Sequence, residues 1–569
     1  MKTLFRQNPG AGDSKDPANA PAGNSLPAVD FFSRRGVGEG WLAALLLTLP
    51  TALWIFCDKS VWPWDESLYG ALATNLWWDL THHHLYAWFF HMETAFGNKA
   101  PGIALFGQFF VPVGQIFGSV EVGLLLFLYL AQVVSLRLIF AVGRAGAGGA
   151  RLPGWLAAGL VGAAPLAIGM SHLFLVESLQ LFAAVYFYWI AAVLPGGSRL
   201  RLAAHAVLAL SLGMLAKVTF PVYVLAPVIV IAVRWWREGS KAPQAPGGRV
   251  SRVLLVAAGF TALLTADWYR VNLSTVLDFM RFNTVGWIAP YYGKPGPFLD
   301  KLGYWIASAQ REFFGPFSAW ILVPVVVAGV VLVVNRGRRE GWPRPGWATL
   351  LAAASVGQCG FILVLFACQN NDGTRFLLPA LPALVVPVVH LLAAARSRLL
   401  IAAMAMVLGL QFIWVQGVCF GWSEPRPDIS LWLAALETDA SARSEVTRIA
   451  AATSDDGNVT ITGIEIPWLN ANTLYFSAAK LRLKTNRLGL YNNLGFAPTN
   501  PGLAWREMLA QNPVYFVTLD PRHQPKPPDM LNLVDLDVRD RVRRSPNFAR
   551  QDYPSADGVE IYRRTAGPK

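Results

Sequence analysis

The chain has 569 residues, of which 54% are hydrophobic and 15% are charged. An average soluble domain carries about 25% charged residues, so this balance, a mean hydropathy of +0.39 and 22 tryptophans exclude an ordinary soluble protein. They predict a polytopic membrane protein with interfacial aromatic residues. The net charge of +13 is that of many nucleic-acid binders, but lysines and arginines also collect in cytoplasmic loops beside anionic lipid. We therefore expect membrane lipids, and no nucleic acid, as partners.

The N-terminal segment, 1–38, is polar and rich in Gly, Pro, Ala and Asn, which predicts a disordered cytoplasmic tail. It lacks the short basic region and adjoining apolar core of a signal peptide. The first apolar segment, 41–57, is therefore predicted to be a retained membrane anchor.

Apolar runs of about 17–25 residues predict transmembrane helices. We treat 100–117 as an interfacial helix, because this choice places every strongly basic short loop on the cytoplasmic side, whereas an added span would place them outside. The transmembrane domain, 39–421, is then predicted to have eleven spans: 41–57, 120–143, 153–170, 173–194, 202–217, 219–236, 252–270, 318–335, 347–368, 375–394 and 399–421.

Two long polar segments, 58–118 and 271–317, are predicted to form outer loops. Within the first, 67–80 and 100–117 are mildly apolar and predict helices that lie along the membrane surface. The odd number of spans places the C-terminus outside the membrane.

The C-terminal part, 422–569, has the composition of a soluble domain. We expect a small extracytoplasmic α/β domain with a helix at 470–483. Its strands are predicted at 458–463, 514–518 and 558–562. The four cysteines all lie in or beside apolar segments, and their spacing indicates neither a zinc site nor a disulfide framework.

Two adjacent carboxylates, Asp65 and Glu66, follow the first span between tryptophans. Carboxylates at a membrane boundary are costly unless they are used. A purely structural alternative is that both stabilise the N-terminus of the following helix.

Further charged residues fall on the same outer face in this topology. The topology rests on the arginines of the short loops alone, so the convergence of these other charged residues on one face is an independent observation. Taken singly, an acid can form a structural ion pair, a lysine can snorkel to the interface and an arginine can anchor it. Together they favour a functional site that consists of Asp65, Glu66, Lys99, Glu177, Lys217, Asp267, Arg270, Asp372 and Arg375.

These residue types suit a substrate with an apolar tail in the bilayer and a phosphate–sugar head at the surface. Cations can bind the phosphate and stabilise its charge as it leaves. A carboxylate opposite them can accept a proton from an acceptor hydroxyl or amine. Direct displacement with one base would invert the anomeric carbon, so the retaining scheme with two carboxylates is not required.

A group of histidines on the outer segment, 82–84, together with His91 and Glu93, is compatible with a divalent metal. Three consecutive histidines cannot all face one ion from a helix, and a polar interfacial loop is the favoured interpretation. The residues that would ligate a metal are His84, His91 and Glu93. No other cofactor is indicated.

The order of these motifs resembles that of the GT-C membrane glycosyltransferases, and within them the group of protein O-mannosyltransferases and aminoarabinose transferases that modify lipid A. The resemblance covers about residues 40–420. It is carried by Asp65-Glu66 after the first span, Lys99-Ala-Pro101, Glu177 at the start of a later span, Leu215-Ala-Lys217, and Arg375-Phe-Leu-Leu-Pro-Ala-Leu-Pro382.

The resemblance implies a polyprenyl- or dolichyl-phosphate sugar donor and transfer of a hexosyl or pentosyl group on the extracytoplasmic face. The acceptor would be a lipid, a glycan or a protein. By the family pattern, Asp65 is the base or its close partner, Glu66 orients the loop, and Lys99, Lys217 and Arg375 lie near the donor phosphate. The remaining acids and Arg270 would contact the substrate: Glu177, Asp267, Arg270 and Asp372.

The sequence departs from the family pattern at three positions. Glu177 stands where an aspartate is usual, Val218 replaces a glycine after Lys217, and Lys99 is followed by Ala-Pro instead of Pro-Pro. These departures bear on the donor sugar and the acceptor more than on the class of enzyme.

Three other functions remain as alternatives. A transporter or flippase for a lipid-linked saccharide should carry charges near the bilayer midplane and show repeated halves. An oligosaccharide polymerase or ligase also has long outer loops, and a noncatalytic relative would fit the departures at Glu177 and Val218. The short basic loops on one side agree with a bacterial inner membrane and an outward-facing site in the cell envelope.

Overall fold

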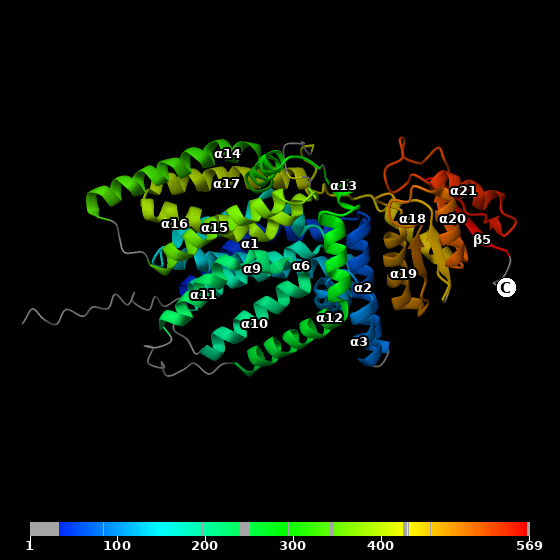
Figure 1. The fold of residues 1–569 in the computed structure, drawn as a ribbon, viewed down its shortest axis with the longest axis horizontal. Coiled ribbons are helices and arrows are strands. Elements are labelled where there is room, and N and C mark those ends of the chain that lie inside the picture. The colour runs from blue at the N-terminus through cyan, green and yellow to red at the C-terminus, as the bar shows by residue number, and fades with distance from the viewer. Residues whose placement is uncertain are drawn as a thin grey trace, which may run out of the picture.

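The computed structural model describes these residues: 34–82, 85–194, 199–238, 251–293, 295–341, 346–424, 430, 432–455 and 457–565. Most of the predicted N-terminal tail, 1–33, lies outside them. From Arg34 the chain is helical, so the first helix begins earlier than its apolar core indicates. A bundle of long helices and a smaller C-terminal sheet domain make up the molecule (Figure 1).

The polytopic α-helical architecture predicted from the sequence is confirmed. In the described part of the chain, nine helices are long and apolar enough to cross a membrane. They are α1 (Arg34–Cys57), α6 (Val120–Gly146), α9 (Val176–Val193), α10 (Arg199–Ala216), α12 (Arg252–Thr284), the second half of α14 (Phe298–Glu340), α15 (Trp347–Ala367), η3 (Thr374–Ala380) with α16 (Leu381–Ala395), and α17 (Arg398–Cys419).

The predicted span at 153–170 is bent. It consists of α7 (Arg151–Gly162) and α8 (Pro165–Ser171), which meet at 63°. Pro165 lies at the first position of α8, where its missing N–H and fixed φ favour the start of a new helix. Counting this pair as one span gives ten.

The predicted span at 219–236 has a shorter regular helix than expected. It consists of the 3₁₀ turn η2 (Phe220–Tyr223) and α11 (Leu225–Glu238), which has 14 residues. The Tyr223 hydroxyl donates to the Phe376 carbonyl at one end of the bundle. At the other end, Arg234 donates to the carbonyl of Ala191, near the end of α9. The segment therefore leads from one end of the bundle to the other.

The segment 58–118 is helical at the two predicted positions, 67–80 and 100–117, and contains a further helix at 85–94 that was not predicted. Most of the first helix is buried. The helices of this segment are α2 (Trp64–His82), α3 (Leu85–Thr94), α4 (Gly102–Gly107), η1 (Gln108–Phe110) and α5 (Val111–Ile116). None of these is long and apolar enough to span a membrane. Figure 1 shows α2 lying across the direction of the long helices, at the end of the bundle nearest the C-terminal domain.

The second polar segment, 271–317, which was predicted to connect two spans as an outer loop, is mostly helical. It contains the end of α12, the short α13 (Ala289–Tyr292) and the first part of α14. Buried Trp305 and Phe313 lie eight residues apart, a helical spacing, and they tie this part of α14 to the bundle. Gly315 has φ +57 and separates it from the membrane-spanning part.

The C-terminal domain is a five-stranded sheet in the order β2-β1-β3-β5-β4, which confirms the predicted α/β class. The strands β2, β1 and β3 are parallel, and β5 is antiparallel to β3 and β4. The sequence predicted β1, β3 and β5 but missed β2 and β4. The elements are α18 (Ser441–Thr453), β1 (Val459–Thr462), α19 (Ala471–Thr485), β2 (Leu490–Asn493), α20 (Pro501–Ala510), β3 (Tyr515–Leu519), α21 (Asp535–Arg544), β4 (Phe548–Arg550) and β5 (Val559–Arg564).

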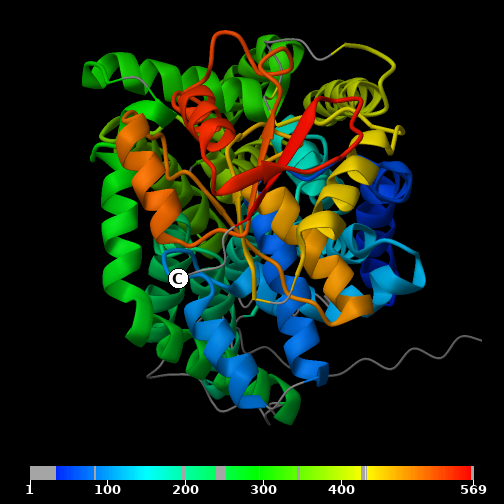
Figure 2. The same cartoon turned by 90° about the vertical axis from the view of Figure 1, so that its right-hand side faces the viewer.

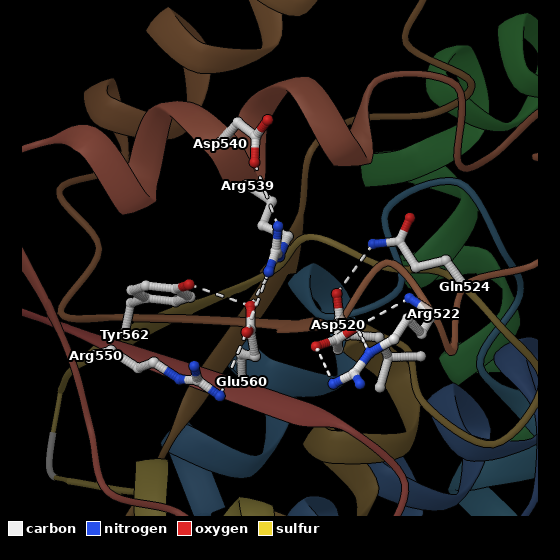
Figure 3. Close-up of polar contacts among 9 residues, drawn as sticks. Asp520, Arg522, Gln524, Arg539, Asp540, Arg550, Glu560 and Tyr562 are labelled. Atoms are coloured by element: carbon white, nitrogen blue, oxygen red, sulfur yellow. Dashed lines mark hydrogen bonds and ion pairs between the residues drawn. The ribbon is translucent and has the colours of Figure 1, made fainter.

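A buried ion pair fastens α21 to this sheet (Figure 3). Arg539 of α21 donates from Nε and Nη2 to the two carboxylate oxygens of Glu560 on β5, at 2.7 and 3.1 Å. The Tyr562 hydroxyl donates to the same carboxylate at 3.1 Å, and Arg550 approaches it from the neighbouring strand at 3.4 Å. Both oxygens of Glu560 are therefore satisfied, as a buried charge requires.

The C-terminal domain lies across the end of the bundle (Figure 2) and packs its helix α19 along α2. Asn75 of α2 donates to the Tyr475 hydroxyl at 3.0 Å and accepts from Arg482 at 3.0 Å. Gly70 permits the close contact, because a Cβ there would come within 2.9 Å of the Phe476 ring. The helix α2 is therefore held between the bundle and the C-terminal domain.

Candidate active site

The first turn of α2 carries the two carboxylates and has an unusual backbone. Trp64, immediately before Asp65, has φ +33, which is rare for a bulky residue and is maintained only when the surroundings enforce it. The surroundings include Trp62, whose ring stacks between Phe174 of the bundle and Phe476 of the C-terminal domain, at 5.5 and 5.2 Å. The position of Asp65 thus depends on both parts of the molecule.

Asp65 lies between two cationic side chains. Its Oδ1 is 2.6 Å from Lys99 Nζ and its Oδ2 is 3.3 Å from Arg375 Nη2. Burial by itself would raise the pKa of Asp65, but the charges of Lys99 and Arg375 outweigh burial and hold the pKa of this carboxyl well below its usual range. Asp65 is therefore ionised in this arrangement.

Glu177 lies between two cationic side chains in the same way. Its Oε1 is 3.1 Å from Lys217 Nζ and 3.4 Å from Arg375 Nε. Glu177 is in the first turn of α9, where the helix dipole favours a carboxylate, and it is completely buried. Arg375 is thus shared between Asp65 and Glu177, and it joins the five side chains into one cluster.

The cluster has an excess of positive charge. It holds three cations, Lys99, Lys217 and Arg375, against two carboxylates. The side chains of the cations are 22–28% exposed, whereas that of Glu177 is 1% exposed. An accessible cluster with one uncompensated positive charge is suited to an anion such as a phosphate group.

Aromatic rings lie close to two of the cations. Lys217 Nζ lies 3.9 Å from the centroid of the Phe376 ring, and the Arg375 guanidinium lies 5.3 Å from that of Trp432. Trp432 is fixed because its Nε1 donates to the Thr374 hydroxyl. The sequence analysis missed both aromatic residues. Phe376 could have been found from its place beside Arg375, but no sequence signal connects Trp432 with the site.

Glu66, the second carboxyl of the first turn, is in a different environment from Asp65. It is buried, and one of its oxygens accepts from the Phe174 backbone N–H at 3.3 Å. Burial, with smaller contributions from the charges of Asp58 and Asp65, raises the pKa of Glu66 to about 8. At neutral pH Glu66 is mostly protonated while its neighbour Asp65 is ionised.

The structure places three further predicted site residues differently. Asp267 pairs with Arg270 at 3.0 Å, and Arg270 approaches Glu93 of α3 at 3.9 Å. Asp267, Arg270 and Glu93 therefore form a separate, more exposed cluster on α12 and α3. Asp372 lies three residues before Arg375. Its backbone N–H donates to the Tyr292 carbonyl and its carbonyl accepts from the Tyr304 hydroxyl.

The metal-ligand candidates do not come together among the described residues. His91 pairs with Asp79 of α2, Glu93 belongs to the Arg270 cluster, and His84 lies outside the described residues. Within the described ranges, no group of three or more His, Cys, Asp or Glu side chains is placed to hold a metal ion.

No protein-family model matches the sequence, and no curated protein matches it. The structure is similar to that of ArnT from Cupriavidus metallidurans bound to undecaprenyl phosphate, with a TM-score of 0.53 and 13% sequence identity over 92% of this chain and 99% of that chain. It is also similar to the apo state of the same protein, with a TM-score of 0.51 and 12% identity over 94% and 100% of the two chains.

These similarities extend over the bundle and the C-terminal domain together, because they cover nearly all of both chains. The chain therefore has the fold of the GT-C membrane glycosyltransferases, as the order of its motifs predicts.

Proposed function

We propose that this protein is an inverting glycosyltransferase that moves a sugar from a polyprenyl-phosphate carrier to an acceptor outside the membrane. The observation that carries the proposal is the cluster at the first turn of α2, where Asp65 and Glu177 share three cations between them. The GT-C fold supports the general class of enzyme. The ArnT structure with undecaprenyl phosphate supports the lipid-phosphate donor.

The donor phosphate would bind Lys99, Lys217 and Arg375. Arg375 offers a planar group that can make two parallel hydrogen bonds to a phosphate, and the lysines add point charges. Glu177, buried beneath Lys217 and Arg375, would keep these two cations in place. As the bond between the anomeric carbon and the phosphate oxygen breaks, the leaving phosphate gains charge that the cations stabilise.

Asp65 would accept the proton of the attacking acceptor. While Lys99 and Arg375 contact Asp65, the pKa of its carboxyl is too low for an efficient base at neutral pH. A phosphate that draws Lys99 and Arg375 toward itself weakens their interaction with Asp65, so the pKa of its carboxyl rises when the donor is bound. Donor binding would thereby prepare the base. Glu66 would remain protonated beside it.

Asp267 and Arg270 would contact substrate farther from the reacting atoms, since they form a cluster of their own. Asp372 would position Arg375 through the segment that connects them. We place the active site on the extracytoplasmic face of a bacterial inner membrane, because the basic short loops lie at the opposite ends of the long helices.

The test is transfer from radiolabelled polyprenyl-phosphate sugars in membranes that contain the full chain. Asp65→Asn retains the size of the side chain and removes its basicity, so we expect transfer to fall by about 100-fold or more. The matched control is Asp552→Asn, an exposed aspartate of the C-terminal domain, which should leave transfer unchanged.

Undiminished transfer by a folded and inserted Asp65→Asn variant would refute the role of Asp65 and direct attention to Glu66 and Glu177. A wild-type chain that transfers no sugar from any donor, but moves the lipid-linked saccharide across a bilayer, would refute the enzyme and favour a flippase.

A further inference from the structure

A group of exposed aromatic rings stands at the junction of the two parts of the molecule. Trp287, Tyr291 and Tyr292, in and just before α13, surround Phe496 of the C-terminal domain, with ring centroids 6.0–6.3 Å apart. The exposed fractions of these four side chains lie between 37% and 58%. We refer to Trp287, Tyr291, Tyr292 and Phe496 as the aromatic cluster.

The aromatic cluster is tied to the charged site by the backbone. The Asp372 N–H donates to the Tyr292 carbonyl at 3.1 Å, and Arg375 follows three residues later. Gly293 permits this contact, because a Cβ there would lie 2.1 Å from the Asn370 carbonyl oxygen. Figure 1 shows α13 where the bundle meets the C-terminal domain.

The charged site also acts on the aromatic cluster directly. Burial raises the pKa of Tyr292, Asp65 raises it further, and Arg375 opposes the rise. The Tyr292 phenol is therefore within electrostatic reach of the carboxylate that faces the acceptor.

We infer that the aromatic cluster is a subsite for a sugar ring of the acceptor, and that the acceptor is therefore a glycan or a saccharide-bearing lipid. This inference rests on the proposed function. One face of a pyranose or furanose ring consists of polarised C–H groups, which pack against the electron-rich faces of aromatic rings. The tyrosine hydroxyls at the rim can hydrogen-bond the sugar hydroxyls, as in binding sites that combine aromatic walls with a few polar groups.

Two features distinguish this subsite from aromatic residues that only anchor a protein at the membrane surface. Phe496 comes from the sheet domain, between β2 and α20, and completes the cluster from outside the membrane part. The rings of Trp287 and Tyr291 are nearly perpendicular to that of Phe496, at 71° and 79°, and each of the three side chains is at least 37% exposed.

The test measures binding of methyl glycosides of mannose, galactose, glucose and arabinofuranose to the full chain in nanodiscs, by saturation-transfer difference NMR with sorbitol as the negative control. We expect saturation of the ring C–H protons of at least one glycoside. Trp287→Ala and Phe496→Ala should each weaken it by about threefold or more. The control Trp236→Ala, which removes an exposed tryptophan of α11, should leave it unchanged.

A second measurement separates this inference from the proposed function. Thermal stabilisation by undecaprenyl phosphate should be retained in Trp287→Ala and Phe496→Ala, whereas sugar transfer to membrane acceptors should fall. Asp65→Asn should lose transfer but keep the glycoside signal. A wild-type chain that saturates no glycoside more than sorbitol would overturn the subsite, and so would aromatic variants that bind glycosides normally. Loss of undecaprenyl phosphate binding in the aromatic variants would assign the rings to the donor or the lipid surface instead, and would also overturn it.

Discussion

Two groups of charged side chains, one at the first turn of α2 and one between α21 and β5 of the C-terminal domain, differ in how their charges balance. In the C-terminal domain, Arg539 and Glu560 are 5% and 3% exposed and meet through two parallel hydrogen bonds. At the first turn of α2, the partly exposed Asp65 is shared between Lys99 and Arg375, and Arg375 is shared again with Glu177.

The difference indicates what each group is for. A closed, matched pair leaves no charge for a ligand and fixes one helix on a sheet. An open cluster with three cations and two carboxylates keeps one positive charge that only an added anion can neutralise. The imbalance and the exposure of the cations, more than the presence of charged residues, mark the site at α2.

The largest effect should come from removing the shared cation. Arg375→Gln leaves Asp65 and Glu177 with one lysine each and abolishes the excess positive charge, so we expect sugar transfer to fall by about 10²–10³-fold. The measurement is transfer from the polyprenyl-phosphate donor in membranes. Arg550→Gln removes the 62% exposed arginine beside Glu560 and should not change transfer. Equal losses in both variants would contradict the distinction between the two groups.

Breaking the closed pair should affect stability and not chemistry. Glu560→Gln leaves Arg539 buried without its carboxylate, so the C-terminal domain should lose about 3–5 kcal/mol of unfolding free energy. Hydrogen exchange of β3 and β5 in the full chain measures this loss. Asp540→Asn removes the 48% exposed partner of Arg539 and should cost less than about 1 kcal/mol. Similar values for the two variants would show that burial does not set the strength of these pairs.

Two buried carboxyls of the C-terminal domain, which pair with no cation among the described residues, offer a third case and a smaller effect. Burial raises the pKa of Glu465 to about 7, and burial together with the charges of Glu465 and Asp529 raises the pKa of Asp535 to about 9. The folded domain therefore holds protons that the unfolded chain releases. Its stability should be greatest in acid and should fall as the pH rises from about 4 to 9, by about 3 kcal/mol for Glu465, since one pKa unit corresponds to about 1.4 kcal/mol.

Hydrogen exchange of β1 and β3 across this pH range measures the fall in stability. Glu465→Gln and Asp535→Asn remove the titrating groups and should flatten the profile. A stability that rises with pH between 4 and 9 in the wild type would contradict the raised pKa values.

Much of the fold could be predicted from the sequence, because long apolar runs in a membrane protein have few alternatives to helices. The span at 219–236 is an exception: Pro221 and Pro227 lack the N–H groups of a regular helix, and hydropathy does not register that loss. The helices within 271–317 were not predicted, because the polar residues of this segment hide the helical spacing of Trp305 and Phe313. The strand β4 has only three residues, and β2 ends in Asn492 and Asn493, a residue type that is depleted in strands.

The site was predicted in part. Asp65, Lys99, Glu177, Lys217 and Arg375 do form one cluster, since a polar residue at the outer edge of each span can only meet the others there. The shared position of Arg375 could not be predicted, because it depends on side-chain geometry. The separate pairing of Asp267 with Arg270 follows from their spacing of three residues on a helix, and that local pair competes with the distant cluster. Trp432 and Phe496 come from the C-terminal part, and no local pattern relates them to α2.

The contact between α2 and α19 also has a consequence for the order in which the protein is made. Asn75 and Tyr475, which hydrogen-bond each other, are separated by 400 residues of chain. A ribosome that has translated the bundle has already produced Asp65 and all its cationic partners, yet the helix that covers Gly70 and Asn75 has still to emerge. The contact that covers one side of α2 is thus synthesised long after α2 itself. A nascent chain that stops before α19 contains all five charged residues of the cluster, but the helix that carries Asp65 has one side uncovered.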